Sequence, residues 1–219
     1  MTLVVAAPCA NFVVVGADSR GTIQDIAGNR SEINIMEKII EVGTHVVILT
    51  YGDSDSSNYL VEKFKDQCNN IDGVTRVAEQ FASLCRDEMS KIRSVPHLPN
   101  FFPNFGFIIA GLDKVNRKYT RPRCYNLKSI TGCMLGRPLP FAIDGKPFIA
   151  HYLFAQKFHP NMELDDLCAL VAQVIYDTMS IDGDVGGKIK IGVINQTKFR
   201  ELLYVDVKRS IRQWSHLVI

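Results

Sequence analysis

Thr2, Asp18 and Lys38 are residue types that together could carry out a nucleophilic reaction. Initiator methionine is normally removed when the second residue is small, so trimming of Met1 would expose Thr2 as the first residue. A threonine with a free α-amine holds nucleophile and base together, because its hydroxyl attacks while its amine takes the proton. An α-amine titrates at about 7.7–8.0, close to the working pH of a general base. The bland alternative is that Thr2 merely begins a strand.

The acidic and basic partners lie in short motifs further along the chain. Asp18 belongs to ADSRGT at residues 17–22, and Lys38 begins KIIE at residues 38–41. Gly52 follows fourteen residues beyond the lysine, within TYGD. Without their order along the chain, a buried ion-pair cluster is the better explanation of Asp18, Arg20 and Lys38.

Short apolar segments predict the strands that would position these residues. The predicted strands of the first part are residues 3–7, 12–17, 33–36, 38–42 and 46–51. Those of the later part are residues 105–112, 119–127, 189–195 and 201–207. Their nearly continuous apolar character is typical of strands buried on both faces.

Two pairs of helices separate these groups of strands. The first helix begins with cap residues, and apolar residues recur at three- and four-residue steps in the longer helices. The predicted helices are residues 53–66, 74–93, 148–157 and 164–179. The passage 132–147, rich in glycine and proline, predicts turns. Two sheets between two helix layers would use every apolar face, so we expect one α+β domain over residues 1–219.

Composition excludes several classes of protein. Lys and Arg number 25 and Asp and Glu 23, a formal net charge of +2, which argues against a nucleic-acid binder with a large basic surface. No apolar run reaches the roughly 18 residues of a membrane span. The histidines lack metal-binding spacing, so we expect no metal and no cofactor. Six cysteines without a CxxC pair predict reduced thiols, and the absence of a signal peptide predicts the cytoplasm.

The motifs in this order resemble those of the β-type, catalytic subunits of the proteasome and their bacterial proteasome-like relatives, which are N-terminal-nucleophile hydrolases. The family pattern is an N-terminal threonine, an ADSRxT turn, a lysine in a KxIE-like strand and a glycine that opens a helix. IIAGLD at residues 108–113 resembles the family's central strand, and DGDVGG at 182–187 resembles its late DxxSGG turn. The resemblance spans roughly residues 2–195. It implies a four-layer αββα sandwich of two mainly antiparallel sheets between helix layers.

The resemblance also implies roles for particular residues. Thr2 would be nucleophile and base, Lys38 would lower the proton affinity of its hydroxyl, and Asp18 would pair with Lys38. The N–H of Gly52 would stabilise the oxyanion. The residues that would support or line this site are Arg20, Asp144, Asp182, Gly186, Thr22, Thr50 and Ser54. Within this last set, Thr22, together with Gly52, would hold an extended peptide, and Arg20, Thr50 and Ser54 would line the specificity pocket.

Three departures from the family pattern are visible. The segment between Thr22 and Lys38 is longer than usual, which would reshape one wall of the substrate groove. Val185 stands where the DxxSGG turn has its serine, whereas Asp182 matches the aspartate of that turn. Asp144 stands where a GSG turn has serine; as a partner of the amine, its charge would raise the pKa of that amine.

The resemblance implies a threonine peptidase that cleaves peptides or unfolded proteins through an acyl-ester on Thr2. Relatives form rings, so we expect a homo-oligomer, and an unfolding ATPase is a conceivable partner. Two alternatives stay open: a non-catalytic, ring-forming scaffold, favoured by retention of Met1, and an amidase or transpeptidase that uses the same Thr2 chemistry.

Overall fold

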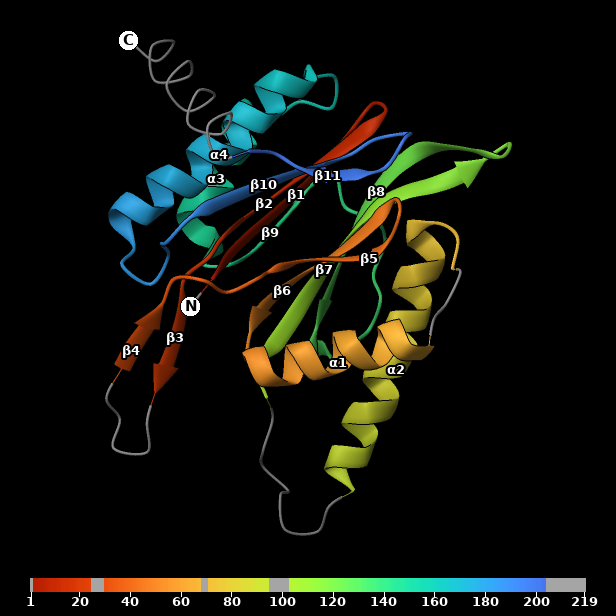
Figure 1. Cartoon of the computed structure of the whole chain (residues 1–219), viewed down its shortest axis with the longest axis vertical. Coiled ribbons are helices and arrows are strands. Elements are labelled where there is room, and N and C mark those ends of the chain that lie inside the picture. The colour runs from red at the N-terminus through yellow and green to blue at the C-terminus, as the bar shows by residue number, and fades with distance from the viewer. Residues whose placement is uncertain (1, 25–29, 68–70, 95–102, 204–219) are drawn as a thin grey trace.

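Four layers are stacked in the order helices, sheet, sheet, helices (Figure 1). The structure is a computed structural model that describes residues 2–24, 30–67, 71–94 and 103–203. The five-stranded sheet has the order β11-β10-β2-β1-β9, and the four-stranded sheet has the order β5-β6-β7-β8. All strand pairs in both sheets are antiparallel. The predicted sandwich of two antiparallel sheets between helix layers is therefore confirmed.

The strands are mostly short and apolar, as a doubly covered sheet requires. The five-stranded sheet consists of β1 (Leu3–Cys9), β2 (Phe12–Asp18), β9 (Ala142–Gly145), β10 (Ile189–Ile194) and β11 (Phe199–Glu201). The four-stranded sheet consists of β5 (Ile39–Gly43), β6 (Val46–Gly52), β7 (Phe105–Val115) and β8 (Lys118–Lys128). A separate hairpin, β3 (Gly21–Gln24) with β4 (Arg30–Ile33), projects from the end of β2 (Figure 1).

Each helix pair covers the outer face of one sheet. The helices are α1 (Ser54–Gln67), α2 (Val74–Arg93), α3 (Pro147–Lys157) and α4 (Leu164–Ile181), with a short 3₁₀ turn at Ser129–Thr131. Helix α1 is capped where Oδ1 of Asp53 accepts the N–H of Ser56 at 2.7 Å. Helix α3 begins at Pro147. Proline suits this first position, because the N–H that it lacks would have no partner within the helix.

Three buried apolar clusters fill the three spaces between the four layers. One lies between the five-stranded sheet and helices α3 and α4, and one lies between the four-stranded sheet and helices α1 and α2. The third lies between the sheets. Side chains of β1 alternate accordingly: Leu3 and Val5 face α4, whereas Val4 and Ala6 face the other sheet. Continuing this alternation by one residue puts Thr2 on the inter-sheet side.

Several element predictions need correction. Residues 34–36 are not a strand: β4 ends at Ile33, because Asn34 and Met36 turn back to hydrogen-bond Ser19. Lys38 precedes β5 rather than beginning it. Strand β9 lies within the passage predicted as turns. The last predicted strand is instead β11, which begins at Phe199, and residues 204–207 lie outside the described residues.

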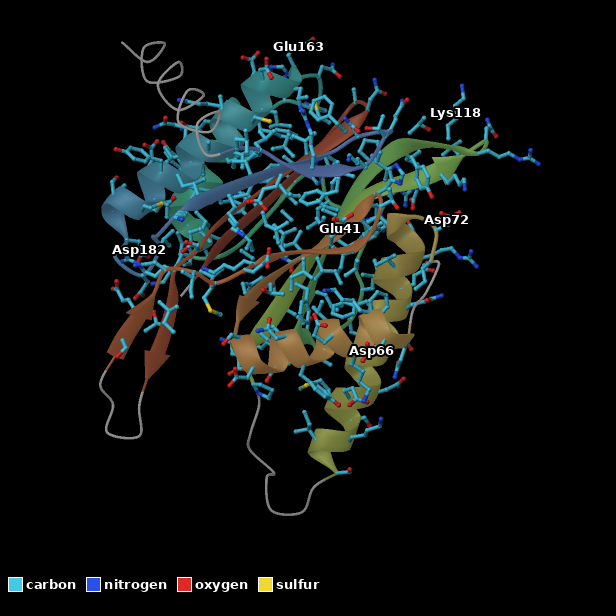
Figure 2. All side chains as sticks on the ribbon, in the orientation of Figure 1. Glu41, Asp66, Asp72, Lys118, Glu163 and Asp182 are labelled. Carbon is cyan, nitrogen blue, oxygen red and sulfur yellow. The ribbon has the colours of Figure 1, made fainter. Side chains whose placement is uncertain are left out.

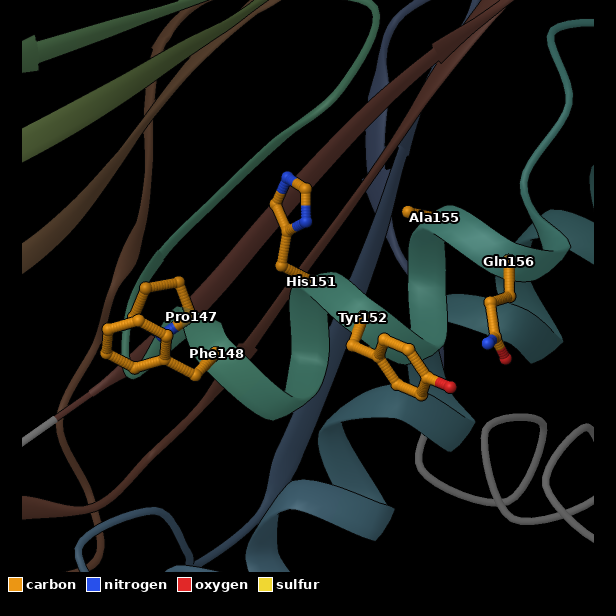
Figure 3. A pocket seen from close by; sticks show the side chains of 6 residues that line it. All are labelled: Pro147, Phe148, His151, Tyr152, Ala155 and Gln156. Atoms are coloured by element: carbon orange, nitrogen blue, oxygen red, sulfur yellow. The ribbon is translucent and has the colours of Figure 1, made fainter.

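The start of β1, the end of β2 and the hairpin β3–β4 lie at one end of the sandwich (Figure 1). Asp182 lies at this end, and Lys118, at the start of β8, lies at the opposite end (Figure 2). A hollow of about 540 Å³ lies elsewhere, along the outer side of α3, where Phe148 and Tyr152 line it (Figure 3). No helix among the described residues has the length and apolar character that crossing a membrane demands.

Candidate active site

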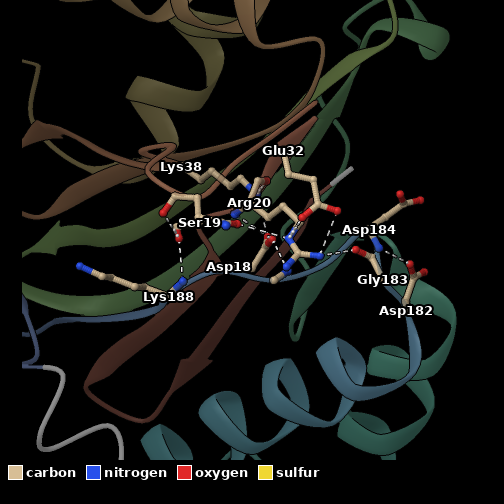
Figure 4. A network of polar contacts seen from close by, with 11 residues as sticks. Asp18, Ser19, Arg20, Glu32, Lys38, Asp182, Gly183, Asp184 and Lys188 are labelled. Carbon is tan, nitrogen blue, oxygen red and sulfur yellow. Dashed lines mark hydrogen bonds and ion pairs between the residues drawn. The ribbon is translucent and has the colours of Figure 1, made fainter. Parts of the chain in front are cut away.

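The Asp18 carboxylate is the centre of a buried polar network (Figure 4). Its Oδ1 accepts the Lys38 ammonium at 2.8 Å and the backbone N–H of Leu3 at 2.8 Å. Its Oδ2 accepts the backbone N–H groups of Gly186 at 3.0 Å and Arg20 at 3.2 Å. Four donors therefore fix the carboxylate that strand β2 carries to the end of its sheet.

Lys38 is held from both its side chain and its backbone. Its Nζ donates to the Arg20 carbonyl at 2.5 Å as well as to Asp18, and its own carbonyl accepts the Thr50 N–H at 3.0 Å. Burial, the largest influence, lowers the pKa of the Lys38 ammonium from its usual 10.5, and the Asp18 carboxylate opposes that change. Lys38 is thus a positioned cation that gives up its proton more easily than a free lysine does.

Thr2 directly precedes Leu3, whose backbone N–H is one of the donors to Asp18. The Leu3 N–H that follows Thr2 shares one carboxylate oxygen with the Lys38 ammonium. Thr2 itself is only 7% exposed. Its carbonyl is packed against Gly145, where an added Cβ would lie 2.0 Å from that oxygen. The structure therefore brings Thr2, Asp18 and Lys38 to the same end of the sandwich.

Arg20 ties the turn after α4 to this centre. Its guanidinium donates to the Gly183 carbonyl at 2.5 Å and pairs with Glu32 at 3.4 Å. Gly186 lies against that guanidinium, so that a Cβ there would lie 2.5 Å from it. Glycine at position 186 therefore leaves room for the Arg20 guanidinium while its own N–H donates to Asp18. Arg20 in turn holds this turn through the Gly183 carbonyl.

Asp182 organises the same turn from within. Its Oδ1 accepts the N–H of Asp184 at 2.9 Å, and its Oδ2 lies 3.3 Å from the Lys146 ammonium. Lys146 also pairs with Asp184 at 3.2 Å. These contacts link the turn to Lys146, which directly follows β9.

Gly52 ends β6 in a conformation that other residues rarely adopt. Its φ is 85°, and a Cβ there would lie 2.2 Å from the Asn104 carbonyl oxygen. The next N–H, of Asp53, donates to that same carbonyl at 2.8 Å. The close approach of β6 to the residue before β7 therefore requires glycine at this position.

The predicted substrate-binding residues come from three elements. Thr22 is exposed on β3, where it pairs with Glu32 of β4. Thr50 is buried on β6, two residues before Gly52. Ser54 begins α1 and is partly buried. Thr50 is joined to the Asp18 network through its bond to Lys38, whereas Thr22 lies on the projecting hairpin.

The Proteasome family, described as proteasome subunit, matches residues 2–194. The chain belongs to this family. A proteasome subunit beta type-6 from Dictyostelium discoideum is 25% identical over 89% of this chain and 85% of its own length. A proteasome subunit beta 2 from Ignicoccus hospitalis is 24% identical over 91% of this chain and 88% of its own length.

A solved structure supports the same fold. The Anbu (Gly-1) mutant from Hyphomicrobium sp. strain MC1 superposes with a TM-score of 0.76 at 17% identity. The match covers 100% of this chain and 95% of that one. The sandwich is therefore the proteasome-type, N-terminal-nucleophile hydrolase fold, and the resemblance carried by the motifs is confirmed at the level of the family.

One departure from the family pattern lies beside Thr2. Asp144 is on β9, where it pairs with Val4 of β1 in the antiparallel register. Its carboxylate contacts Lys128 Nζ at 2.5 Å and accepts the side-chain N–H of Asn126 at 2.7 Å. Sequence reasoning missed both partners. Asn126 and Lys128 share the face of β8 on which Cys124 meets the inter-sheet cluster, and this alternation was the available signal.

The second departure has a different environment. Val185 is buried with the apolar side chains beneath α4, and its N–H donates to the Asp182 carbonyl at 3.1 Å. It therefore serves packing and presents no hydroxyl. Among the described residues, no three or more His, Cys, Asp or Glu side chains are grouped so that they could hold a metal ion. The five cysteines of the described part are buried and form no disulfide with one another.

Proposed function

We propose that this proteasome-family chain is a threonine peptidase that forms an acyl-ester on Thr2 after Met1 has been removed. One observation carries the proposal. The peptide N–H directly after Thr2 and the buried Lys38 ammonium bind the same oxygen of Asp18, at 2.8 Å each. A buried lysine ammonium bound to the same carboxylate oxygen as the N–H after Thr2 has a clear chemical use if Thr2 is the nucleophile.

In the proposed reaction the Thr2 hydroxyl oxygen bonds to the carbonyl carbon of the scissile peptide. The hydroxyl proton passes to the α-amine of Thr2 and then to the leaving amine as the C–N bond breaks. Water repeats the attack on the ester, which releases the acid and restores the hydroxyl. The Gly52 N–H would stabilise the oxyanion, since its backbone position is fixed by the close packing against Asn104.

Lys38 and Asp18 would act on the nucleophile through charge. The ammonium lowers the proton affinity of the Thr2 hydroxyl, and Asp18 holds the ammonium in place. Arg20, Gly186 and Asp182 would support Asp18 through the turn after α4. Asp144 would face the amine from β9 and favour its protonated form.

The substrate would be an extended peptide that adds as a strand, with main-chain bonds to Thr22 and Gly52. Arg20, Thr50 and Ser54 would line the pocket that takes a side chain of this bound peptide. Family membership supports a ring of identical subunits that encloses the sites, with unfolded protein as substrate. Cytoplasmic location and an unfolding ATPase partner stay predictions, which fractionation and co-purification from the native source test.

Intact-mass measurement is the first test. Loss of Met1 supports the proposal, whereas a mature protein that keeps Met1 has no free Thr2 amine and favours the non-catalytic scaffold. Turnover of short fluorogenic peptides is the second test, with Thr2→Ala as the inactive variant and Thr75→Ala, on α2, as the matched control. Unchanged turnover in Thr2→Ala would exclude the mechanism. Amide hydrolysis or acyl transfer without peptide cleavage would favour the amidase or transpeptidase.

A further inference from the structure

The space between the sheets changes from apolar to polar as it approaches Thr2. Away from this end it is filled by apolar side chains, among them Val13 and Leu112. At this end three polar side chains from the four-stranded sheet meet Asp144: Tyr51 from β6, and Asn126 and Lys128 from β8. These four residues are called the Asp144 network below.

Tyr51 reaches this network across β7. Its strand partner on β7 is Gly106, where a Cβ would lie 2.2 Å from the tyrosine ring, so only glycine leaves room for the ring. The Tyr51 hydroxyl donates to Asn126 Oδ1 at 2.9 Å. Burial, followed by the negative charge of Asp144, raises the pKa of Tyr51, which therefore stays protonated as a donor.

Asn126 and Lys128 then fix the carboxylate. With Oδ1 of Asn126 engaged by Tyr51, its Nδ2 donates to Oδ2 of Asp144 at 2.7 Å. Lys128 Nζ lies 2.5 Å from the same Oδ2. Oδ1 of Asp144 accepts the N–H of Gly145 at 2.9 Å. The Asp144 carboxylate is therefore bonded through both of its oxygens, with the ammonium on the oxygen that Asn126 also holds.

The register places this carboxylate next to the proposed nucleophile. Asp144 pairs with Val4 and Gly145 pairs with Leu3, so Asp144 lies diagonally across from Thr2 on neighbouring strands. Diagonal neighbours on one face of a sheet lie about 7–8 Å apart, a distance at which a carboxylate charge still acts on a neighbouring titratable group inside a protein. Thr2 and Asp144 both belong to the inter-sheet face, because Val4 does.

We propose that Lys128 is a positioning residue for the Thr2 centre, because its ammonium pairs with Asp144 and limits how strongly that carboxylate stabilises the protonated Thr2 amine. The inference rests on the proposed function. Lys128 thereby sets the pH at which the amine becomes a free base.

The sign follows from the charges. The other charged or titratable groups described above at this end are Asp18, Arg20, Glu32, Lys38, Tyr51, Lys146, Asp182 and Asp184. They are unchanged when Lys128 is replaced. Removal of the Lys128 cation leaves Asp144 less compensated, so the pKa of the amine rises. Removal of the Asp144 anion lowers it. Because the Lys128 side chain is 41% exposed, solvent screening limits the effect to about 0.5–1 pH unit.

Competitive acetylation with acetic anhydride measures the pKa of the amine directly. The protein is the full chain produced with Thr2 first, by natural trimming or by cleavage of a removable fusion, and the acetylated N-terminal peptide is quantified by mass across pH. We expect the pKa to rise in Lys128→Met, to fall in Asp144→Asn, and to match the parent in Lys128→Arg. The matched control is Lys118→Met, at the far end of β8 (Figure 2).

The outcomes are separable from those of peptide turnover. An amine pKa that does not change in Lys128→Met, in a variant that unfolds in urea as the parent does, overturns the inference. A merely structural role would reduce folding stability and leave the pKa of the amine in the folded protein unchanged. If the parent cleaves no peptide but the pKa shifts appear, the charge coupling is supported and the proposed function fails.

Discussion

The Lys38 ammonium and the Asp18 carboxylate form an ion pair at 2.8 Å, with the two side chains 4% and 0% exposed. A buried pair costs desolvation and is by itself weak evidence for stability. Its retention beside Thr2 is explained if the charge has a task there. Function and stability can therefore be separated by changing one partner or both.

Lys38→Met should lower kcat by at least about 100-fold, because the charge that activates the Thr2 hydroxyl is lost. It should also lower the free energy of unfolding by about 3–5 kcal/mol, since Asp18 is left buried and unpaired. Asp18→Asn together with Lys38→Met should recover much of that stability but no activity. Urea unfolding and peptide turnover measure the two effects, with Lys65→Met, from the surface pair with Glu62, as control. Recovery of activity in the double variant would contradict the role of the charge.

Activity should decline on the alkaline side at a pH below the usual 10.5 of lysine. Burial lowers the pKa of Lys38, so its charged form is present below that lowered pKa and is lost as pH rises through it. The pH profile of kcat/KM measures this limb. Lys38→Arg, if it turns over substrate, keeps its charge and should lose the limb. An alkaline limb that is identical in Lys38→Arg would assign it to another group.

Gly52→Ala should abolish most activity. At a φ of 85° the added Cβ would lie 2.2 Å from the Asn104 carbonyl, so the strand end must move and carry the proposed oxyanion donor with it. Loss of one such donor lowers kcat by about 100- to 1,000-fold. Gly43→Ala, where an added Cβ meets nothing within 4 Å, should retain activity. Equal kcat values for the two variants would remove Gly52 from the mechanism.

Phe81→Ala should lower the free energy of unfolding by about 3–5 kcal/mol. The Phe81 ring is buried between α2 and the four-stranded sheet, with its centroid 4.7 Å from that of Phe107 and 5.1 Å from that of Phe64. Phe148→Ala is the matched control, since Phe148 is 90% exposed on α3. Urea unfolding of both variants makes the comparison, and equal losses would contradict the layer arrangement.

Periodicity predicted the long elements well. Helix α2 matches its predicted range of 74–93, because its apolar residues repeat over five turns. Strand β9 was missed because four residues, Ala142–Gly145, lie among glycine and proline and owe their conformation to pairing with β1. The hairpin β3–β4 was missed since residues 21–24 have little apolar content and face solvent at Thr22.

The part of the site that lies in local sequence motifs was predictable. The part that depends on contacts between distant strands was not. The order of the motifs indicated that Thr2, Asp18 and Lys38 lie close together. In the structure, the Lys38 ammonium and the N–H that follows Thr2 both bind Asp18. The Asp144 network joins β6, β8 and β9, whose register no local pattern fixes. Tyr51 reaches it only because Gly106 leaves room, a relationship that depends on strand pairing.

The central claim is that Thr2, once first in the chain, is the nucleophile. Its most direct test is reaction with a peptide epoxyketone, an electrophile that needs both the hydroxyl and the α-amine of an N-terminal threonine, followed by peptide mapping by mass. The account predicts one adduct, located on Thr2, together with loss of peptide turnover and no adduct in Thr2→Ala. An unmodified Thr2, or an adduct elsewhere that abolishes turnover, would contradict it.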